Sequence, residues 1–166
     1  MTTRRHFFSA LGSGLGLGLL LLAGAAQAQA QATVRPEQLV KWRQSAYQVL
    51  AWNSGRIKLS LDATYNRDEV LRSAQVIAAL ANANLHSLFP PGTEKTKGWH
   101  DTAARPELFT EPRVATLAAD FTRDANLLAQ AAAAAASGGD VGSIRTAFGN
   151  LTRSCKACHD AYKGRD

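Results

Sequence analysis

Apolar side chains recur every three or four residues along four stretches of the chain, a spacing that places them on one face of an α-helix. The stretches run from about Pro36 to Leu61, from Asn66 to Phe89, from about Pro112 to Ala136 and from Asp140 to Tyr162. In the last stretch the intervals are four, three, four, three and four, through Ile144, Phe148, Leu151, Cys155, Cys158 and Tyr162. Such a stripe is typical of helices that pack at a shallow angle. The sequence therefore predicts an all-α protein, an antiparallel four-helix bundle.

Start and break signals support these four helices. Asn66 is followed three residues later by Glu69, which is the arrangement of a capping box, and Asp140 is placed to cap the fourth helix. Gly55 lies inside the first helix. It either marks a bend or lowers the stability of an otherwise regular helix by about 1 kcal/mol.

The second and third helices are joined by a long connection. The run Phe89-Pro90-Pro91-Gly92 ends the second helix, because proline has no amide proton and restricts the residue before it. From Gly92 to Pro112 the apolar pattern is lost. The connection is long for a compact bundle and has room for a short turn of helix.

The first residues have the layout of an export signal. Arg4 and Arg5 precede an uncharged run from residue 11 to residue 26, and Ala-x-Ala steps follow that allow cleavage after Ala28, Ala30 or Ala32. Residues 1–32 are thus predicted to be a cleaved leader, and residues 33–166 the bundle domain, with no membrane anchor in the mature form. The segment from residue 3 to residue 8 also resembles a twin-arginine signal, so two export routes stay open. Both routes predict the periplasm.

The charge balance argues against nucleic acid as a partner. Without the two leader arginines, 17 basic and 13 acidic residues remain, for a net charge of +4. The basic residues are scattered and form no long block, which is the pattern of a solvated surface.

A Cys-x-x-Cys-His motif in the fourth helix carries the chemistry. Cys155 and Cys158 can form thioethers with haem vinyl groups, while His159 ligates the iron. The three residues stand at i, i+3 and i+4 and so share one helix face. A redox dithiol or half of a zinc site is the weaker interpretation, because there is no βαβ pattern and no second cysteine pair. We therefore predict one covalently bound haem c per chain.

The sequence limits what can occupy the other face of the iron. Met1 is the single methionine and leaves with the leader, so the mature protein has no methionine ligand. His86 and His100 remain as candidates. We expect neither to bind the iron, because a lone histidine near a helix end is usually a surface residue.

Several segments resemble the cytochromes c′, the class II c-type cytochromes, over nearly the whole mature chain. They are Val40 to Tyr47, Phe89 to Glu94, Arg105 to Leu108, Ala147 to Gly149 and Cys155 to Lys163. The resemblance implies a homodimeric four-helix bundle with five-coordinate haem. In it, His159 is the single protein ligand, and an apolar distal pocket admits NO and CO.

The resemblance also implies roles for three further residues. Arg43 matches an arginine near a haem propionate, Tyr47 matches the residue over the vacant iron position, and Lys163 matches a basic residue on the proximal side. Tyr47 as an ordinary core aromatic, and Arg43 or Lys163 as solvent-facing side chains, stay open as alternatives.

Two features depart from the family pattern. Residues 95–102, which include Trp99 and His100, look like an insertion of unknown role. His86 stands where relatives often have an aromatic beside the haem, so it can approach the haem edge.

The leading functional hypothesis is reversible binding of NO, and also of CO, by a periplasmic haem protein that is not an enzyme. The alternative is a low-spin electron-transfer cytochrome of class II type, whose redox partner the sequence does not identify.

Overall fold

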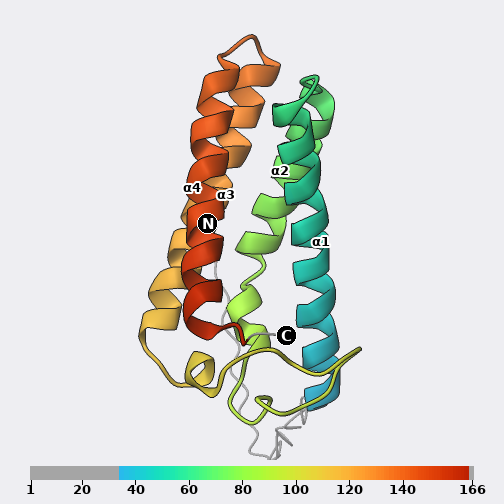
Figure 1. Ribbon diagram of the computed structural model, residues 1–166, viewed down its shortest axis with the longest axis vertical. Helices are drawn as coiled ribbons and strands as arrows, with labels where there is room; N and C mark the ends of the chain where they lie inside the picture. Colours follow the sequence, from blue (N-terminus) through green and yellow to red (C-terminus); the bar gives the residue numbers. More distant parts are fainter. Residues whose placement is uncertain (1–33, 165–166) are drawn as a thin grey trace, which may run out of the picture. The chain divides into compact units, whose positions relative to one another are not determined.

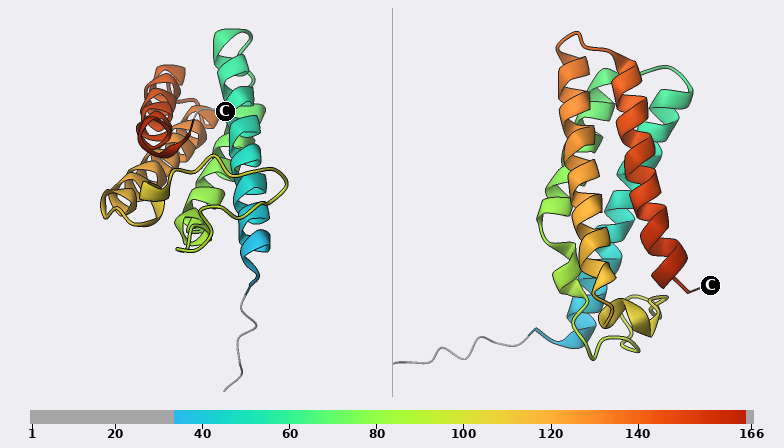
Figure 2. Two further views of the ribbon diagram at one scale, coloured as in Figure 1. Left: turned by 60° about the horizontal axis from the view of Figure 1, so that its bottom comes forward. Right: turned by 90° about the vertical axis from the view of Figure 1, so that its left-hand side faces the viewer.

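The computed structural model describes residues 34–164, so the predicted leader lies outside the described residues. Four antiparallel helices run up, down, up and down the bundle (Figures 1 and 2). They are α1 (Pro36–Asp62), α2 (Arg67–Asn82), α3 (Arg113–Ala136) and α4 (Val141–Tyr162). Between residues 34 and 164 there is no strand, only an isolated bridge between Ala104 and Lys163. The predicted all-α antiparallel bundle is confirmed.

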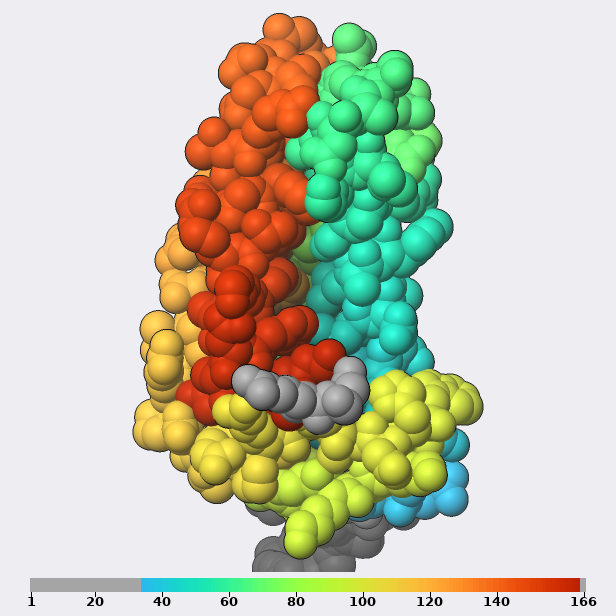
Figure 3. All heavy atoms as spheres, viewed as in Figure 1, coloured from blue at the N-terminus to red at the C-terminus, as the bar shows by residue number. Residues whose placement is uncertain are grey.

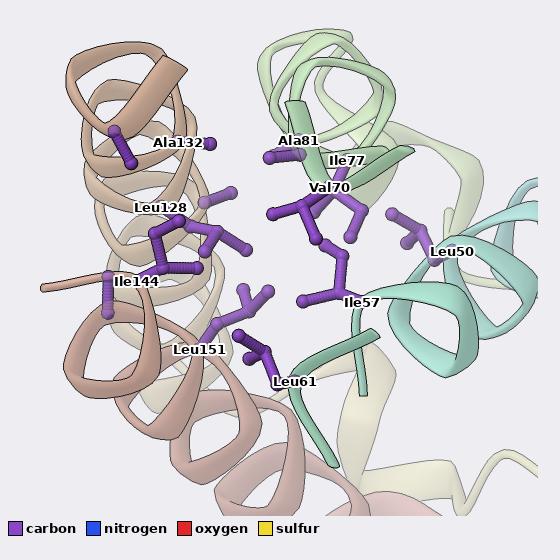
Figure 4. Close-up of a cluster of buried hydrophobic side chains, with 14 of the residues drawn as sticks. Leu50, Ile57, Leu61, Val70, Ile77, Ala81, Leu128, Ala132, Ile144 and Leu151 are labelled. Carbon is purple, nitrogen blue, oxygen red and sulfur yellow. The ribbon is translucent and has the colours of Figure 1, made fainter. Parts of the chain in front are cut away.

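The core lies between helices that follow one another in the chain. α1 packs directly on α2, α2 on α3 and α3 on α4, whereas α1 and α4 have hardly any close backbone contact. Aliphatic side chains from all four helices meet in the cluster of Figure 4, among them Leu50, Ile57, Val70, Ile77, Leu128, Ile144 and Leu151. Each such side chain, when fully buried, contributes about 1.5–3 kcal/mol to folding.

α1 and α4 are joined at the end of the bundle where α1 finishes and α4 begins. There Arg145 Nη2 donates a hydrogen bond to the Leu61 carbonyl oxygen at 2.5 Å. Figure 3 shows the two helices in contact at this end and a hollow between them lower down. The bundle is thus closed at one end and open along the rest of its α1–α4 face.

The predicted caps are present, but the capping box of α2 is only half formed. The Asn66 side chain accepts from the Glu69 amide at 3.1 Å. The Glu69 carboxylate does not return this contact, because it forms an ion pair with Arg56 at 2.7 Å. The Asn66 amide instead donates to Ser60 Oγ at 2.8 Å. At α4, Asp140 accepts from the Gly142 amide at 2.9 Å, as predicted.

The second helix is shorter than its apolar pattern predicts. α2 ends at Asn82, and Asn84 has a left-handed backbone with φ of 55°. Asparagine tolerates this conformation better than most residues. A single 3-10 turn, η1 (Leu85–Leu88), then continues the apolar spacing without continuing the helix. Leu85 is buried as the pattern requires, although the helix has already ended.

The connection between α2 and α3 crosses the open end of the bundle (Figure 1). It contains the expected short turn, η2 (Pro106–Phe109). It is fastened to the end of α4 by two backbone hydrogen bonds, from the Arg105 amide to the Tyr162 oxygen at 2.8 Å and from the Gly164 amide to the Ala103 oxygen at 2.6 Å. No helix between residues 34 and 164 is long and apolar enough to span a bilayer.

Residues 95–102, whose role the sequence left open, dock on α1. Gln44 binds the backbone of this segment at both ends of its amide: Oε1 accepts from the Trp99 amide at 2.7 Å, and Nε2 donates to the His100 oxygen at 3.0 Å. The Trp99 indole donates to Ser45 Oγ at 3.0 Å. The Lys41 ammonium lies 4.8 Å from the Trp99 ring centroid. The segment is therefore held along one turn of the helix.

Gly98 gives a test of this docking. A Cβ atom added there would lie 2.7 Å from Val40 Cγ1 and would also meet the Gln44 amide, so Gly98→Ala forces one of them to move. We expect a loss of about 1–3 kcal/mol in the free energy of unfolding, measured by denaturant titration of the holoprotein.

Gly55→Ala is the matched control. It lies within α1, and a Cβ there meets nothing within 4 Å. We expect it to raise the free energy of unfolding by about 1 kcal/mol. Equal effects of the two substitutions would contradict the close approach at Gly98.

Candidate functional site

A cavity of about 1300 Å³ lies within the described part of the chain, lined by residues of all four helices and of the connection. It opens toward the face between α1 and α4, where Figure 3 shows the hollow. Most of its lining is apolar, with Leu50, Ile77, Phe89, Leu117 and Phe121 among the larger side chains. Polar groups come mainly from α4, from α1 and from the connection. All six residues singled out from the sequence line this one cavity: Arg43, Tyr47, Cys155, Cys158, His159 and Lys163.

The α4 wall carries the two cysteines. Cys155 and Cys158 are half-buried free thiols that face the cavity one helical turn apart. Burial raises the pKa of both thiols above the ordinary value. They are therefore neutral thiols here, unlike the low-pKa thiolates of redox dithiol sites. The expectation that Cys155, Cys158 and His159 share a face is confirmed.

The imidazole of His159 is tuned toward its neutral form. Burial lowers its pKa, the Lys163 ammonium lowers it further, and the Asp160 carboxylate opposes them. A neutral imidazole keeps the lone pair that a metal ligand needs. Lys163 also donates its backbone amide to the His159 oxygen at 3.0 Å, immediately after α4 ends. This basic residue therefore lies beside the candidate iron ligand.

The α1 wall presents Tyr47. Its side chain is 40% exposed because it faces the open cavity, so it is not an ordinary core aromatic. Burial raises the pKa of the phenol to about 12, followed by the negative charges that Cys158 and Cys155 carry when they ionise at high pH. The two cysteine contributions disappear once the sulfurs become uncharged thioethers. The phenol is protonated near neutral pH, and it is a hydrogen-bond donor on the wall that faces α4.

Arg43 lies one turn before Tyr47 and is buried, with 3% of its surface exposed, so the solvent-facing alternative is wrong. Its Nη1 donates to Thr93 Oγ1 at 3.0 Å, and its Nη2 donates to the Thr93 oxygen and to Thr102 Oγ1, each at 3.1 Å. Burial lowers its pKa, with partial compensation from Glu94. The guanidinium remains charged, because the ordinary pKa of arginine is far above neutrality.

The two remaining histidines both line the cavity. His86 lies on η1, and His100 lies in the docked segment beside Gln44. His100 Nδ1 is 2.9 Å from the Asp101 oxygen. In residues 34–164 no group of three or more His, Cys, Asp or Glu side chains is arranged to hold a metal ion.

The residues present fit a haem. The cavity exceeds the roughly 300–1000 Å³ of ordinary small-ligand pockets, and its walls are apolar, as a macrocycle requires. Two neutral thiols and a neutral imidazole stand on one wall. Cationic and hydroxyl groups stand at the connection. Cys155, Cys158 and His159 would hold the group from α4.

Three residues that shape this site were not assigned a role from the sequence: Phe89, Thr93 and Thr102. The ring of Phe89 lies against both Arg43 and Tyr47. Thr93 is 2% exposed, and Thr93 and Thr102 supply the oxygens that bind Arg43. The one signal available was the need of an arginine on an apolar helix face for hydrogen-bond acceptors, which does not say where in the chain they lie.

Known proteins match the chain over most of its length. The family described as Cytochrome C' matches residues 38–163. Cytochrome c′ of Rhodocyclus tenuis is 45% identical over 134 residues, which cover 80% of this chain and 98% of that protein.

Solved structures agree. Cytochrome c′ from Thermochromatium tepidum has 41% identity and a TM-score of 0.74, over 81% of this chain and 100% of its own. A ferrous cytochrome c′ variant from Alcaligenes xylosoxidans with bound NO has 34% identity and a TM-score of 0.66, over 80% of this chain and 98% of its own. With its Cys-x-x-Cys-His wall in a four-helix bundle, the chain belongs to the cytochrome c′ family, which carries covalently attached haem c.

Proposed function

We propose that this protein is a periplasmic haem protein whose five-coordinate iron reversibly binds small gases, NO foremost and also CO, as sequestration or protection. One observation carries the proposal. Cys155, Cys158 and His159 face a single apolar cavity from α4, and Tyr47 faces it from α1. The one methionine of the chain is Met1, so the mature protein has no methionine to fill a sixth position.

In this proposal the α4 residues hold the haem. The thiols of Cys155 and Cys158 form the two thioether bonds, and His159 supplies the proximal nitrogen. When bound, the haem supplies an iron whose open coordination position accepts a diatomic gas. Lys163 stands beside His159, where its charge adds to the effect of burial in lowering the pKa of the imidazole. It also provides a basic group on the proximal side.

In the same proposal, Tyr47 lies over the open coordination position of the iron. An incoming gas must move the ring aside, which slows entry and penalises larger or weakly binding molecules. Because the phenol is protonated, it also offers a hydrogen bond to a polar ligand, which an aliphatic side chain could not do.

Arg43 is proposed to lie next to a haem propionate. Its guanidinium lines the cavity at the connection, where Thr93 and Thr102 already hold it in place. A propionate there would gain a charge-assisted partner that needs no further ordering.

Related structures support the choice of ligand. Structures of Alcaligenes xylosoxidans cytochrome c′ variants contain bound NO and bound CO. They are similar to this chain over about four-fifths of its length.

A low-spin electron-transfer cytochrome is the second candidate. It is favoured by one observation, that His86 and His100 both line the cavity and one of them would have to be the sixth ligand. The redox partner would then be a further protein that the chain does not identify.

We also propose a homodimer through α1. Trp42, Val49, Trp52 and Leu59 are exposed and follow one another at intervals of seven, three and seven residues. This is the spacing of a helix seam, and Trp52 and Leu59 are the most exposed, at 61% and 71%. A related cytochrome c′ structure has a dimer whose dissociation is ligand-controlled.

Absorption spectra test the function. The purified ferric and ferrous holoprotein should show high-spin bands, and the ferrous bands should shift when CO or NO is added. An unresponsive low-spin spectrum would sink the gas-binding proposal and favour a bis-histidine iron. Spectra of His86→Ala and His100→Ala variants would then identify the sixth ligand.

Tyr47→Ala should speed CO association with the ferrous protein by on the order of tenfold, since removing about 1.4 kcal/mol from a barrier has that effect. Stopped-flow or flash photolysis measures the rate. Tyr47→Phe is the matched control: it keeps the ring and loses the hydroxyl, so its association rate should stay near that of the wild type. An unchanged CO association rate in Tyr47→Ala would show that Tyr47 does not control the entry of the gas.

Leu59→Glu should weaken the dimer by about tenfold or more, because it places a charge in the apolar stripe at a position that costs the monomer little. Sedimentation equilibrium of the holoprotein measures the dissociation constant. Leu127→Glu, at an exposed apolar position of α3, is the control and should leave it unchanged. Equal dissociation constants for the wild type and Leu59→Glu would contradict the α1 interface.

A further inference from the structure

Phe89 is the centre of a cluster at the open end of the bundle, made of Arg43, Tyr47, Phe89 and Phe109. Its ring meets the ring of Tyr47 edge-to-face, with centroids 6.0 Å apart and planes at 68°. The Phe109 ring centroid lies 6.1 Å from that of Phe89, with the ring planes at 56°. The Arg43 guanidinium carbon lies 4.8 Å from the Phe89 centroid and 5.6 Å from that of Phe109. Phe89 therefore touches all three other members.

The Phe89 ring is held in place by contacts other than that with Tyr47. Arg43 is buried and hydrogen-bonded to Thr93 and Thr102, so its charge cannot move off the ring without losing those bonds. The Thr93 hydroxyl in turn donates to the Pro90 oxygen at 2.9 Å. Pro90 also restricts the backbone of Phe89. The Phe89 amide is bound as well, to the His86 oxygen at 3.0 Å.

Tyr47 is held on fewer sides. It projects from α1 into the open cavity, is 40% exposed, and has the Phe89 edge contact as its one ring-to-ring contact among residues 34–164. An aromatic pair of this geometry shifts a conformational equilibrium by about twofold to tenfold. The more tightly held ring of Phe89 thus biases the position of Tyr47.

We propose that Phe89 is a positioning residue: through the edge contact, its ring holds Tyr47 over the open face of the haem and so sets the rate at which a gas enters. This rests on the proposed gas-binding function. Phe89 acts through Tyr47, not by contact with the ligand, and Arg43 acts one step further back by holding Phe89.

A double-mutant cycle on the holoprotein tests this. CO association rates are measured for the wild type, Phe89→Leu, Tyr47→Ala and the double variant. Phe89→Leu should speed association by about twofold to tenfold, and it should have no further effect when Tyr47 is already alanine. The same acceleration in both backgrounds would overturn the proposal, since Phe89 would then act as a barrier of its own.

Two further variants separate positioning from general packing. Phe89→Tyr keeps the ring and should restore the wild-type rate. Phe121→Leu removes a half-buried, cavity-lining ring from α3 that lies outside the cluster, and it should show no coupling with Tyr47→Ala. Loss of the effect in Phe89→Tyr, or equal coupling for Phe121, would contradict the assignment.

A readout without gas keeps the inference separate from the function. In each background, ultraviolet resonance Raman bands of Tyr47 are obtained by subtracting the spectrum of the same holoprotein with Tyr47→Phe added. They should shift in Phe89→Leu and stay unchanged in Phe121→Leu and Phe89→Tyr. A shift in a protein that does not bind CO would retain the positioning role and overturn the gas-binding function. Unshifted Tyr47 bands in Phe89→Leu would overturn the positioning role whatever the protein binds.

Discussion

The buried guanidinium of Arg43 is the interaction on which the open end of the bundle depends. A charge with 3% exposure inside an apolar cavity wall is tolerated only with hydrogen-bond acceptors around it, and the connection supplies them from Thr93 and Thr102. The connection must therefore cross α1 at this level. Once it does, Phe89 lies against the guanidinium, and Gln44 can accept a hydrogen bond from the Trp99 amide. Arg43 thereby positions the connection, which lines one end of the cavity, and it also forms part of the cavity wall itself.

A prosthetic group in this cavity would also be a packing element of the bundle. Three of the four contacts between neighbouring helices are direct, and the fourth, between α1 and α4, is replaced by the cavity for most of its length. The side chains around that space are largely apolar, including Leu50, Leu117 and Phe121. A haem there would bury surface that no helix covers, and the group that carries the chemistry would then complete the core.

Local patterns were sufficient for the helices and for the α4 wall of the site. The three-and-four spacing identified four helices, and the i, i+3, i+4 relation placed Cys155, Cys158 and His159 on one face. The predicted end of the second helix was wrong. Leu85 continues the apolar spacing, although the left-handed backbone of Asn84 has already ended the helix. The apolar repeat indicates which side of a segment is buried. It does not indicate whether the backbone between two buried residues is still helical.

The α1 wall could be predicted only in part. Arg43 and Tyr47 came from a resemblance, and their shared face followed from their spacing. The partners of Arg43 are 50 and 59 residues away along the chain, in a connection with no periodic pattern, so nothing local ties them together. The same holds for the docking of residues 95–102, which depends on the absence of a side chain at Gly98.

The contact between Arg145 and the Leu61 oxygen determines how the space between α1 and α4 can change. At the opposite end the connection is bound to α1 through Arg43 and Gln44 and to α4 through Arg105, so the two helices are held together at both ends. Tyr47 lies about 21 Å along α1 from the Arg145 contact, on the stretch that faces the cavity and not a neighbouring helix. The two ends act as braces, and the space between α1 and α4 is kept open without direct packing of one helix on the other.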